Sequence, residues 1–138
     1  MSDKRLNLKI ITPEKILVDE DVNSMASLTV DGEVGILPEH LPYMTALDIG
    51  VTRYRHDGKR EYVATIGGIL QVEDNKVIIL TDAADRGEEI DVPRARAAKE
   101  RAEARLGTGV KDVDHDRAQA ALARAMARMK AATKMHHI

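Results

Sequence analysis

Hydrophobic and polar residues alternate with a period of two near the start of the chain. Leu6, Leu8 and Ile10 are separated by polar residues, a pattern typical of a strand with one buried face. Similar short runs follow as far as residue 80, separated by Gly, Pro, Asp and Asn. Because these turn signals recur about every ten residues, the pattern predicts an antiparallel β-sandwich over residues 1–84.

Two hairpins are predicted within this sandwich. Asp57-Gly58 separates two alternating runs and is the preferred signal for a type I′ turn. A second hairpin is expected to join residues 69–72 to residues 77–80 across the polar residues between them. The unbroken apolar run from Val77 to Leu80 predicts burial on both faces, either between two sheets or against a partner.

Beyond residue 84 the chain contains one Arg- and Ala-rich motif twice. Residues 94–106 are echoed by residues 117–129, and each copy follows an Asp three positions before its first Arg. Asp91 and Asp114 are therefore predicted to cap two helices, because an Asp there accepts hydrogen bonds from the free N–H groups of the first turn.

The break between the two copies predicts how the helices pack. Gly107-Thr108-Gly109 supplies a C-cap and an interruption, so an antiparallel two-helix hairpin is the natural arrangement. We place this hairpin at residues 85–138. The expected fold class is therefore α+β, with an N-terminal sandwich followed by a C-terminal helical hairpin.

Each predicted helix carries a row of arginines beside a row of alanines. At 100° per residue, the arginines of each copy fall within one narrow sector. They are Arg94, Arg101 and Arg105 in the first helix and Arg117, Arg124 and Arg128 in the second. The apolar stripe of the second helix comprises Ala118, Ala121, Leu122, Ala125, Met126, Met129 and Ala132. Alanine contacts bury little area, so we expect a weakly docked hairpin that could move.

Composition excludes several classes of protein. With no Cys, the chain has no disulfide framework and no thiolate chemistry. A net charge of −2 argues against nonspecific nucleic-acid binding. No apolar signal segment or membrane-spanning run is present, so we expect a soluble chain.

Known catalytic and metal-binding patterns are also missing. There is no Ser-His-Asp order, no phosphate-cradling Gly-rich loop and no arguable pair of catalytic carboxylates. The Asp triplet at residues 112–116 opens like a calcium loop, but Arg117 stands where that loop needs Gly. We therefore expect a non-catalytic chain without a metal site.

Five short motifs, taken in order, point to a family. They are Thr12-Pro13-Glu14-Lys15, the Gly- and Pro-rich loop from Gly32 to Pro42, Thr45-Ala46-Leu47, Gly67-Gly68-Ile69-Leu70-x-Val72 and Leu80-Thr81-Asp82-x-Ala84. In this order the chain resembles the epsilon subunit of bacterial rotary (F-type) ATP synthases from about residue 6 to residue 130. Glu39 departs from the pattern, since relatives usually have Gly there, so that loop can bend differently in this chain.

The resemblance implies a non-catalytic rotor subunit of the central stalk, peripheral to the cytoplasmic face of the membrane and attached only through the complex. Its sandwich would bind the gamma subunit and the c-ring, and Glu33 and His40 match loop positions near those partners. The alternative interpretation of both residues is a surface carboxylate and a surface imidazole in a turn. The hairpin would either fold onto the sandwich or extend along gamma to the alpha and beta subunits and suppress hydrolysis.

Some relatives bind ATP on the folded hairpin, as a regulatory ligand and not as a cofactor. The matching positions here are Ile90, Asp91, Arg94 and Ala95, supported by Arg101, Arg124 and Arg128, with Asp85 as an acidic contact. Arginines neutralise phosphates, and a carboxylate such as that of Asp91 can accept hydrogen bonds from adenine or ribose. Two alternatives stay open: a solvated or partner-facing row of arginines, and a stand-alone nucleotide-binding sensor without a rotary partner.

Overall fold

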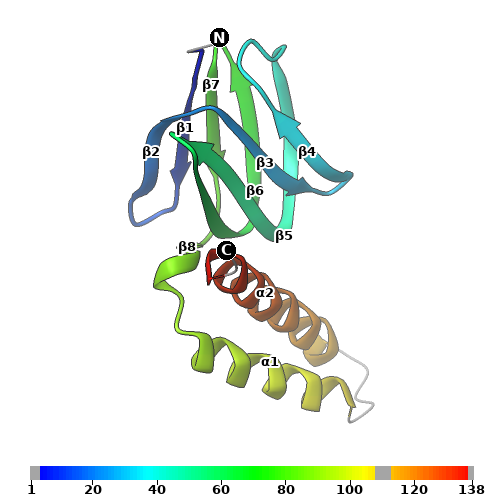
Figure 1. Ribbon diagram of the computed structural model, residues 1–138. Helices are drawn as coiled ribbons and strands as arrows, with labels where there is room; N and C mark the ends of the chain where they lie inside the picture. Colours follow the sequence, from blue (N-terminus) through cyan, green and yellow to red (C-terminus); the bar gives the residue numbers. More distant parts are fainter. Residues whose placement is uncertain (1–3, 108–112, 137–138) are drawn as a thin grey trace.

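The computed structural model describes residues 4–107 and 113–136, with no side chains described for residues 113, 135 and 136. Its strands are β1 (Leu6–Ile11), β2 (Ile16–Val22), β3 (Ser24–Thr29), β4 (Gly32–Ile36), β5 (Tyr43–His56), β6 (Lys59–Glu73), β7 (Lys76–Leu80) and β8 (Ala84–Arg86). A short 3₁₀ helix, η1 (Gly87–Glu89), leads to α1 (Val92–Gly107) and α2 (Val113–His136). The predicted sandwich followed by two helices is confirmed (Figure 1).

The strands form one continuous sheet that folds over itself. Their order is β2-β1-β7-β6-β5-β3-β4, with β8 paired to β6. All pairs are antiparallel except β1 with β7, which run parallel. β5 and β6 are the longest strands, and β6 exchanges β8 for β7 as its second neighbour along its length. This exchange carries the sheet from one layer of the sandwich to the other.

Both predicted hairpins are present. Asp57 and Gly58 have φ of 51° and 81°, which suits the type I′ turn expected between β5 and β6. Asp74 and Asn75 also have positive φ, so the β6–β7 connection is a tight two-residue turn. Local turn chemistry therefore fixes the register of both hairpins.

The core between the layers is almost entirely aliphatic. Its largest fully buried side chains include Leu6, Leu8, Ile10, Ile36, Leu70 and Ile79. The prediction that Val77 to Leu80 is buried on both faces is wrong within this chain, because Leu80 is 52% exposed. Only Val77 and Ile79 point into the core, and the outer face of β7 is left for solvent or a partner.

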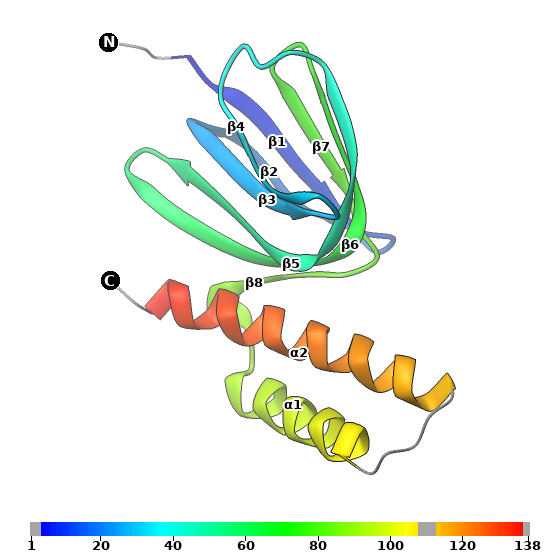
Figure 2. The same cartoon turned by 90° about the vertical axis from the view of Figure 1, so that its right-hand side faces the viewer.

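The helices form a layer beneath the sandwich. α2 lies against the sheet and α1 lies against α2 on the side away from the sheet (Figure 2). α2 therefore has two buried faces. Ala118 and Ala125 lie on the face toward α1, while Ala127 and Ala131 contact Ala64 of β6. The predicted single stripe is wrong in part, because Met126 is 51% exposed and the sheet-facing alanines lie outside the stripe.

Only some of the predicted helix ends are found in the structure. α1 ends at Gly107 as expected, while Thr108 and Gly109 lie outside the described residues. Asp114 does not precede its helix, because α2 begins at Val113; the prediction of an Asp114 cap is therefore wrong, although its charge still suits the first turn. Within the described ranges, neither helix is long and apolar enough to cross a bilayer.

Candidate nucleotide site on the helical hairpin

A cavity of about 360 Å³ lies where the segment after β8 meets both helices. It is lined by Asp85, Glu89, Ile90, Asp91, Arg94, Ala95, Ala98, Ala125 and Arg128. Six of the eight residues predicted for a nucleotide site are among them: Asp85, Ile90, Asp91, Arg94, Ala95 and Arg128. The cavity takes residues from the strand, the connecting segment, α1 and α2, so it exists only while the hairpin is folded.

The two remaining predicted residues line an adjoining cavity of about 300 Å³ between the helices. Arg101 of α1 and Arg124 of α2 face this cavity, which shares Ala98, Ala125 and Arg128 with the first. The seven-and-four spacing of the arginines therefore places cations along one continuous groove between α1 and α2. Small alanine side chains leave the floor of this groove open.

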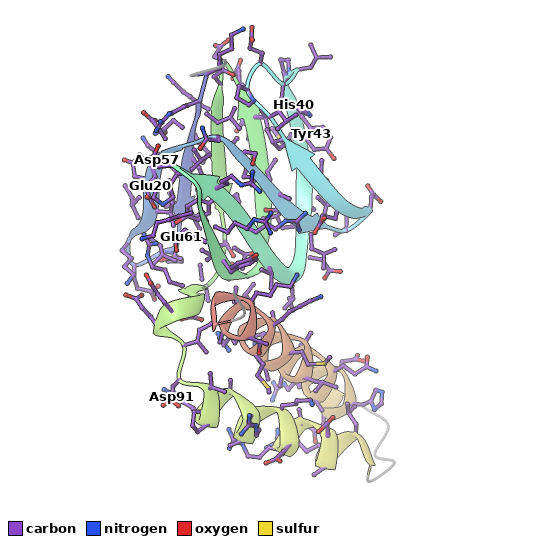
Figure 3. All side chains as sticks on the ribbon, in the orientation of Figure 1. Glu20, His40, Tyr43, Asp57, Glu61 and Asp91 are labelled. Carbon is purple, nitrogen blue, oxygen red and sulfur yellow. The ribbon has the colours of Figure 1, made fainter. Side chains whose placement is uncertain are left out.

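Asp91 lies at the start of α1 (Figure 3), where it lines the first cavity and caps the helix. Its Oδ1 accepts a hydrogen bond of 3.1 Å from the backbone N–H of Arg94, and its carbonyl accepts one from Ala95. The predicted Asp91 cap is confirmed. Since the capping bond restricts the side-chain rotamer, the Asp91 carboxylate is held in one place beside the cavity before any ligand arrives.

Arg128 connects the hairpin to the sheet. Its Nε donates a hydrogen bond of 2.8 Å to Oδ2 of Asp85, and both side chains are only half buried. The sequence motif suggested Asp85 as a ligand contact, whereas here it pairs with an arginine of the same site. The two terminal nitrogens of Arg128 remain able to donate to a phosphate while this bond is kept.

Three other arginines of the groove have no anionic partner among the residues that the structure describes. The guanidinium groups of Arg94, Arg101 and Arg124 form no hydrogen bond or ion pair with other described residues. Like charges on facing helices repel one another, so the folded hairpin has an electrostatic cost that an anion would offset. Phosphate is an anion that forked guanidinium donors bind bidentately, so a polyphosphate could bind several of these arginines at once.

Sequence reasoning missed the residues that anchor β8. Arg86, next to Asp85, donates from Nη2 to the carbonyl of Leu17 (2.9 Å) and from Nη1 to the hydroxyl of Tyr54 (3.2 Å). The Tyr54 hydroxyl donates in turn to Glu20, and burial raises the pKa of Tyr54 above its ordinary value. These contacts join segments far apart in the chain, which is why no local motif signals them.

Glu33 and His40 are not brought together. Glu33 lies on β4 and forms a two-fold salt bridge with Arg53 of β5, at 2.5 and 2.9 Å. Hydrogen bonding to Arg53 lowers the pKa of Glu33, and the nearby charges of Lys134 and Lys130 on α2 act in the same direction.

His40 lies in the loop after β4, at the end of the sandwich away from the helices (Figure 3). Its Nδ1 is 2.6 Å from the carbonyl of Leu41, and its ring lies 5.9 Å from the ring of Tyr43. Glu39, where the family pattern usually has Gly, adopts a φ of 67° in this loop, and its side chain contacts Lys4. The loop therefore keeps the left-handed backbone that Gly would favour.

A β-sandwich followed by a helical domain is the arrangement that two protein-family models together describe for one chain. The first part of the chain, residues 5–87, matches the family model for the beta-sandwich domain of the ATP synthase delta/epsilon chain. Residues 88–133 match the model for the long alpha-helix domain of the same chain. The chain therefore belongs to the ATP synthase delta/epsilon chain family, and the resemblance to the epsilon subunit is confirmed.

Curated relatives and solved structures agree with this assignment. The ATP synthase epsilon chain of Carboxydothermus hydrogenoformans is 52% identical, covering 98% of this chain and 100% of its own. The epsilon chain of Desulforamulus reducens is 44% identical over 94% and 98%. A chain of the Euglena gracilis mitochondrial ATP synthase shares the fold with a TM-score of 0.82 at 24% identity, over 96% of this chain and 84% of its own.

Proposed function

We propose that this chain is a non-catalytic central-stalk subunit of an F-type ATP synthase, coupling the gamma subunit to the c-ring. Its helical hairpin regulates ATP hydrolysis and binds ATP when folded. Relatives named epsilon chain support the first part, as does a fold shared with a central stalk and c-ring structure from Tetrahymena thermophila (TM-score 0.60, 16% identity, covering 96% of this chain and 99% of that one). The subunit would lie on the cytoplasmic face of the membrane, held there through the complex.

The proposal that the hairpin regulates hydrolysis rests on the residues that line the cavity of about 360 Å³, which we call the nucleotide cavity. It unites Asp85 from the strand, Asp91 and Arg94 from the start of α1, and Arg128 from α2. A ligand that needs all these groups binds the folded hairpin and not an extended one. ATP would therefore stabilise the folded state by RT ln(1 + [ATP]/Kd), about 2.7 kcal/mol at a hundred times Kd.

The chemistry of the cavity suits the parts of ATP. Arg94 and Arg128 would hold the phosphates, with Arg101 and Arg124 extending the cationic groove. The free oxygen of the Asp91 carboxylate would accept from adenine or ribose, and Ala95 leaves room for a flat ring. α2 contributes only the alanines Ala127 and Ala131 to the cluster that joins it to the sheet. We therefore expect that, without ATP, the hairpin can leave the sheet for a position along gamma toward alpha and beta.

The partner-binding part rests on the outer face of the sandwich. Met44, Ile69 and Leu80 are 63%, 48% and 52% exposed. They lie on neighbouring strands, because Ile69 of β6 is paired with both Ala46 of β5 and Leu80 of β7. Such a contiguous apolar surface suits a protein partner, for which gamma is the candidate, while Glu33 and His40 would contribute polar contacts.

Calorimetric titration of the whole chain with ATP tests the regulatory proposal. We expect saturable binding that is lost in an Asp91→Asn, Arg94→Ala double variant. Asparagine can still cap α1, so the loss would report the ligand contacts and not helix stability. Arg96→Ala, on α1 but outside both cavities, is the matched control. Absence of heat at millimolar ATP, or equal binding by the double variant, contradicts the site.

A further inference from the structure

A third cavity, of about 560 Å³, lies on the outer face of the sheet beside the C-terminal part of α2. Its lining residues are Ser24, Met25, Ala26, Gly35, Ile36, Leu37, Arg53, Tyr54, Arg55, Arg60, Tyr62 and Lys134. None of them lines either cavity of the hairpin groove. It is therefore a separate feature of the molecule, which we call the sheet cavity.

Strand register explains how the sheet cavity forms. Arg55 of β5 is paired with Arg60 of β6 on one side and with Ser24 of β3 on the other. In the next outward-facing row, Arg53 is paired with Tyr62 and Ala26. Small side chains thus form the floor, and long cationic and aromatic side chains form the walls.

α2 closes one side of the sheet cavity. Its Ala127 and Ala131 cover Ala64, two residues along β6 from Tyr62, and leave the rows beyond uncovered. Lys134, one turn after Ala131 along α2, places its Nζ over the Tyr62 ring, 5.9 Å from the centroid. The cavity therefore takes charged groups from both the sandwich and the hairpin.

The charged side chains that line the sheet cavity are all cationic. Arg53, Arg55, Arg60 and Lys134 line it, and no acidic residue is among the described residues that do so. Only Arg53 has an anionic partner, Glu33; the other three form no ion pair within the described part of the chain. Arg55 and Arg60 are direct cross-strand neighbours, and two like charges in that arrangement destabilise a sheet unless an anion lies between them.

We propose that the sheet cavity binds a di- or triphosphate group, as a second anion site distinct from the nucleotide cavity. Arg55 and Arg60 would each donate paired N–H groups to phosphate oxygens, and Lys134 would add a third cation from the opposite side. The volume lies within the roughly 300–1,000 Å³ of small-ligand sites. A bound phosphate group would bridge the sandwich to α2 and stabilise the docked hairpin. This inference does not depend on ATP binding in the groove.

Inorganic tripolyphosphate is the probe, titrated calorimetrically into the whole chain at about 0.15 M salt to screen long-range attraction. We expect saturable binding that weakens about tenfold or more in an Arg55→Gln, Arg60→Gln variant, because each guanidinium forms charge-assisted hydrogen bonds. Lys15→Gln with Lys76→Gln removes the same charge from exposed positions elsewhere and should leave the affinity within about twofold. No binding, or equal loss in both variants, overturns the site.

A second comparison tests the bridge to the hairpin. Lys134→Gln should weaken tripolyphosphate about threefold or more, whereas Lys130→Gln, one turn earlier on α2 and outside the cavity, should not. Equal effects of the two would mean that the hairpin takes no specific part.

A titration of the Asp91→Asn, Arg94→Ala variant with ATP distinguishes the two possible sources of the phosphate group, a nucleotide and free condensed phosphate. ATP binding that persists there and needs Arg55 and Arg60 assigns the sheet cavity to nucleotides. Tripolyphosphate binding without ATP binding assigns it to free condensed phosphate. Failure of the groove to bind ATP affects only the first proposal, because these readouts depend on Arg55 and Arg60.

Discussion

Gly68 occupies the point where β6 exchanges one neighbouring strand for another. Its φ is 117°, a backbone conformation that L side chains rarely adopt. A Cβ placed there would lie 2.0 Å from the carbonyl oxygen of Leu80 and 2.8 Å from Cα of Thr81. Both neighbours are backbone atoms, which cannot move aside as a flexible side chain can.

Gly68→Ala should therefore lower the free energy of unfolding by about 3 kcal/mol, from backbone strain and overpacking together. Urea denaturation followed by circular dichroism measures the change. Gly35→Ala is the control: Gly35 has ordinary φ, and a Cβ there would meet no atom within 4 Å, so a change below about 1 kcal/mol is expected. Comparable stability of the two variants would show that the sheet relaxes around residue 68.

Individual residues differ in how far the sequence alone could predict them. The Asp91 cap follows from local spacing, since the acceptor and the N–H groups belong to one helical turn. The pairing of Arg128 with Asp85 could not be predicted, because the two residues are 43 positions apart and meet only through the docking of α2. The anchoring of Arg86 by Leu17 and Tyr54 has the same non-local origin.

At the scale of elements, α2 is a helix buried on two opposite sides. The sequence pattern predicted only the side that faces α1, because alanines occur all around the helix and give no clear period. Ala131 is fully buried against the sheet, in a cluster with Ala64 and Ala127. Larger side chains, those of Ile49, Val51, Tyr62 and Ile90, pack around these three alanines and complete the apolar contact.

Ala131→Glu should detach the hairpin while the sandwich stays folded, because a carboxylate would be buried there without a partner. Amide hydrogen exchange should accelerate by about tenfold or more in α1 and α2 and remain unchanged in β1 and β7. Thr133→Glu, exposed on the same helix, adds an equal charge without burial and serves as control. Unchanged protection of the helices in Ala131→Glu would mean that other contacts hold the hairpin.

At the scale of the whole molecule, the two proposed functions occupy different faces. The apolar surface of Met44, Ile69 and Leu80 lies on the sandwich, and the cationic groove lies on the hairpin beneath it. Met44, Ile69 and Leu80 remain exposed while the hairpin is docked, so docking of the hairpin does not bury this apolar surface. Assembly and regulation can then be altered separately by mutation.

Ile69→Lys with Leu80→Lys should prevent a tagged chain from retrieving ATPase subunits from solubilised membranes, because charges would be buried at the gamma contact. Val30→Lys is the control, being equally exposed but on the β3–β4 turn. Retrieval by the double variant would move the contact elsewhere. A wild-type chain that retrieves no ATPase subunits would favour a stand-alone sensor.

The arrangement of strands shows where sequence reasoning reaches its limit. Hairpins such as β5–β6 are signalled by turn residues within the strands' own neighbourhood. The parallel pairing of β1 with β7 has no such signal, since its register depends on packing between the two ends of the domain's sequence. The overall class could thus be predicted, while the path of the sheet could not.

That parallel pair also determines when the sandwich can be completed during synthesis. β1 is synthesised before its neighbour β7, with the long strands β5 and β6 between them in the chain. Until β7 is made, one edge of β1 has no hydrogen-bonding partner, and closing so long a loop carries an entropic cost that must precede the gain. The sandwich can therefore be completed only once β7 has been made, shortly before α1 and α2 are synthesised.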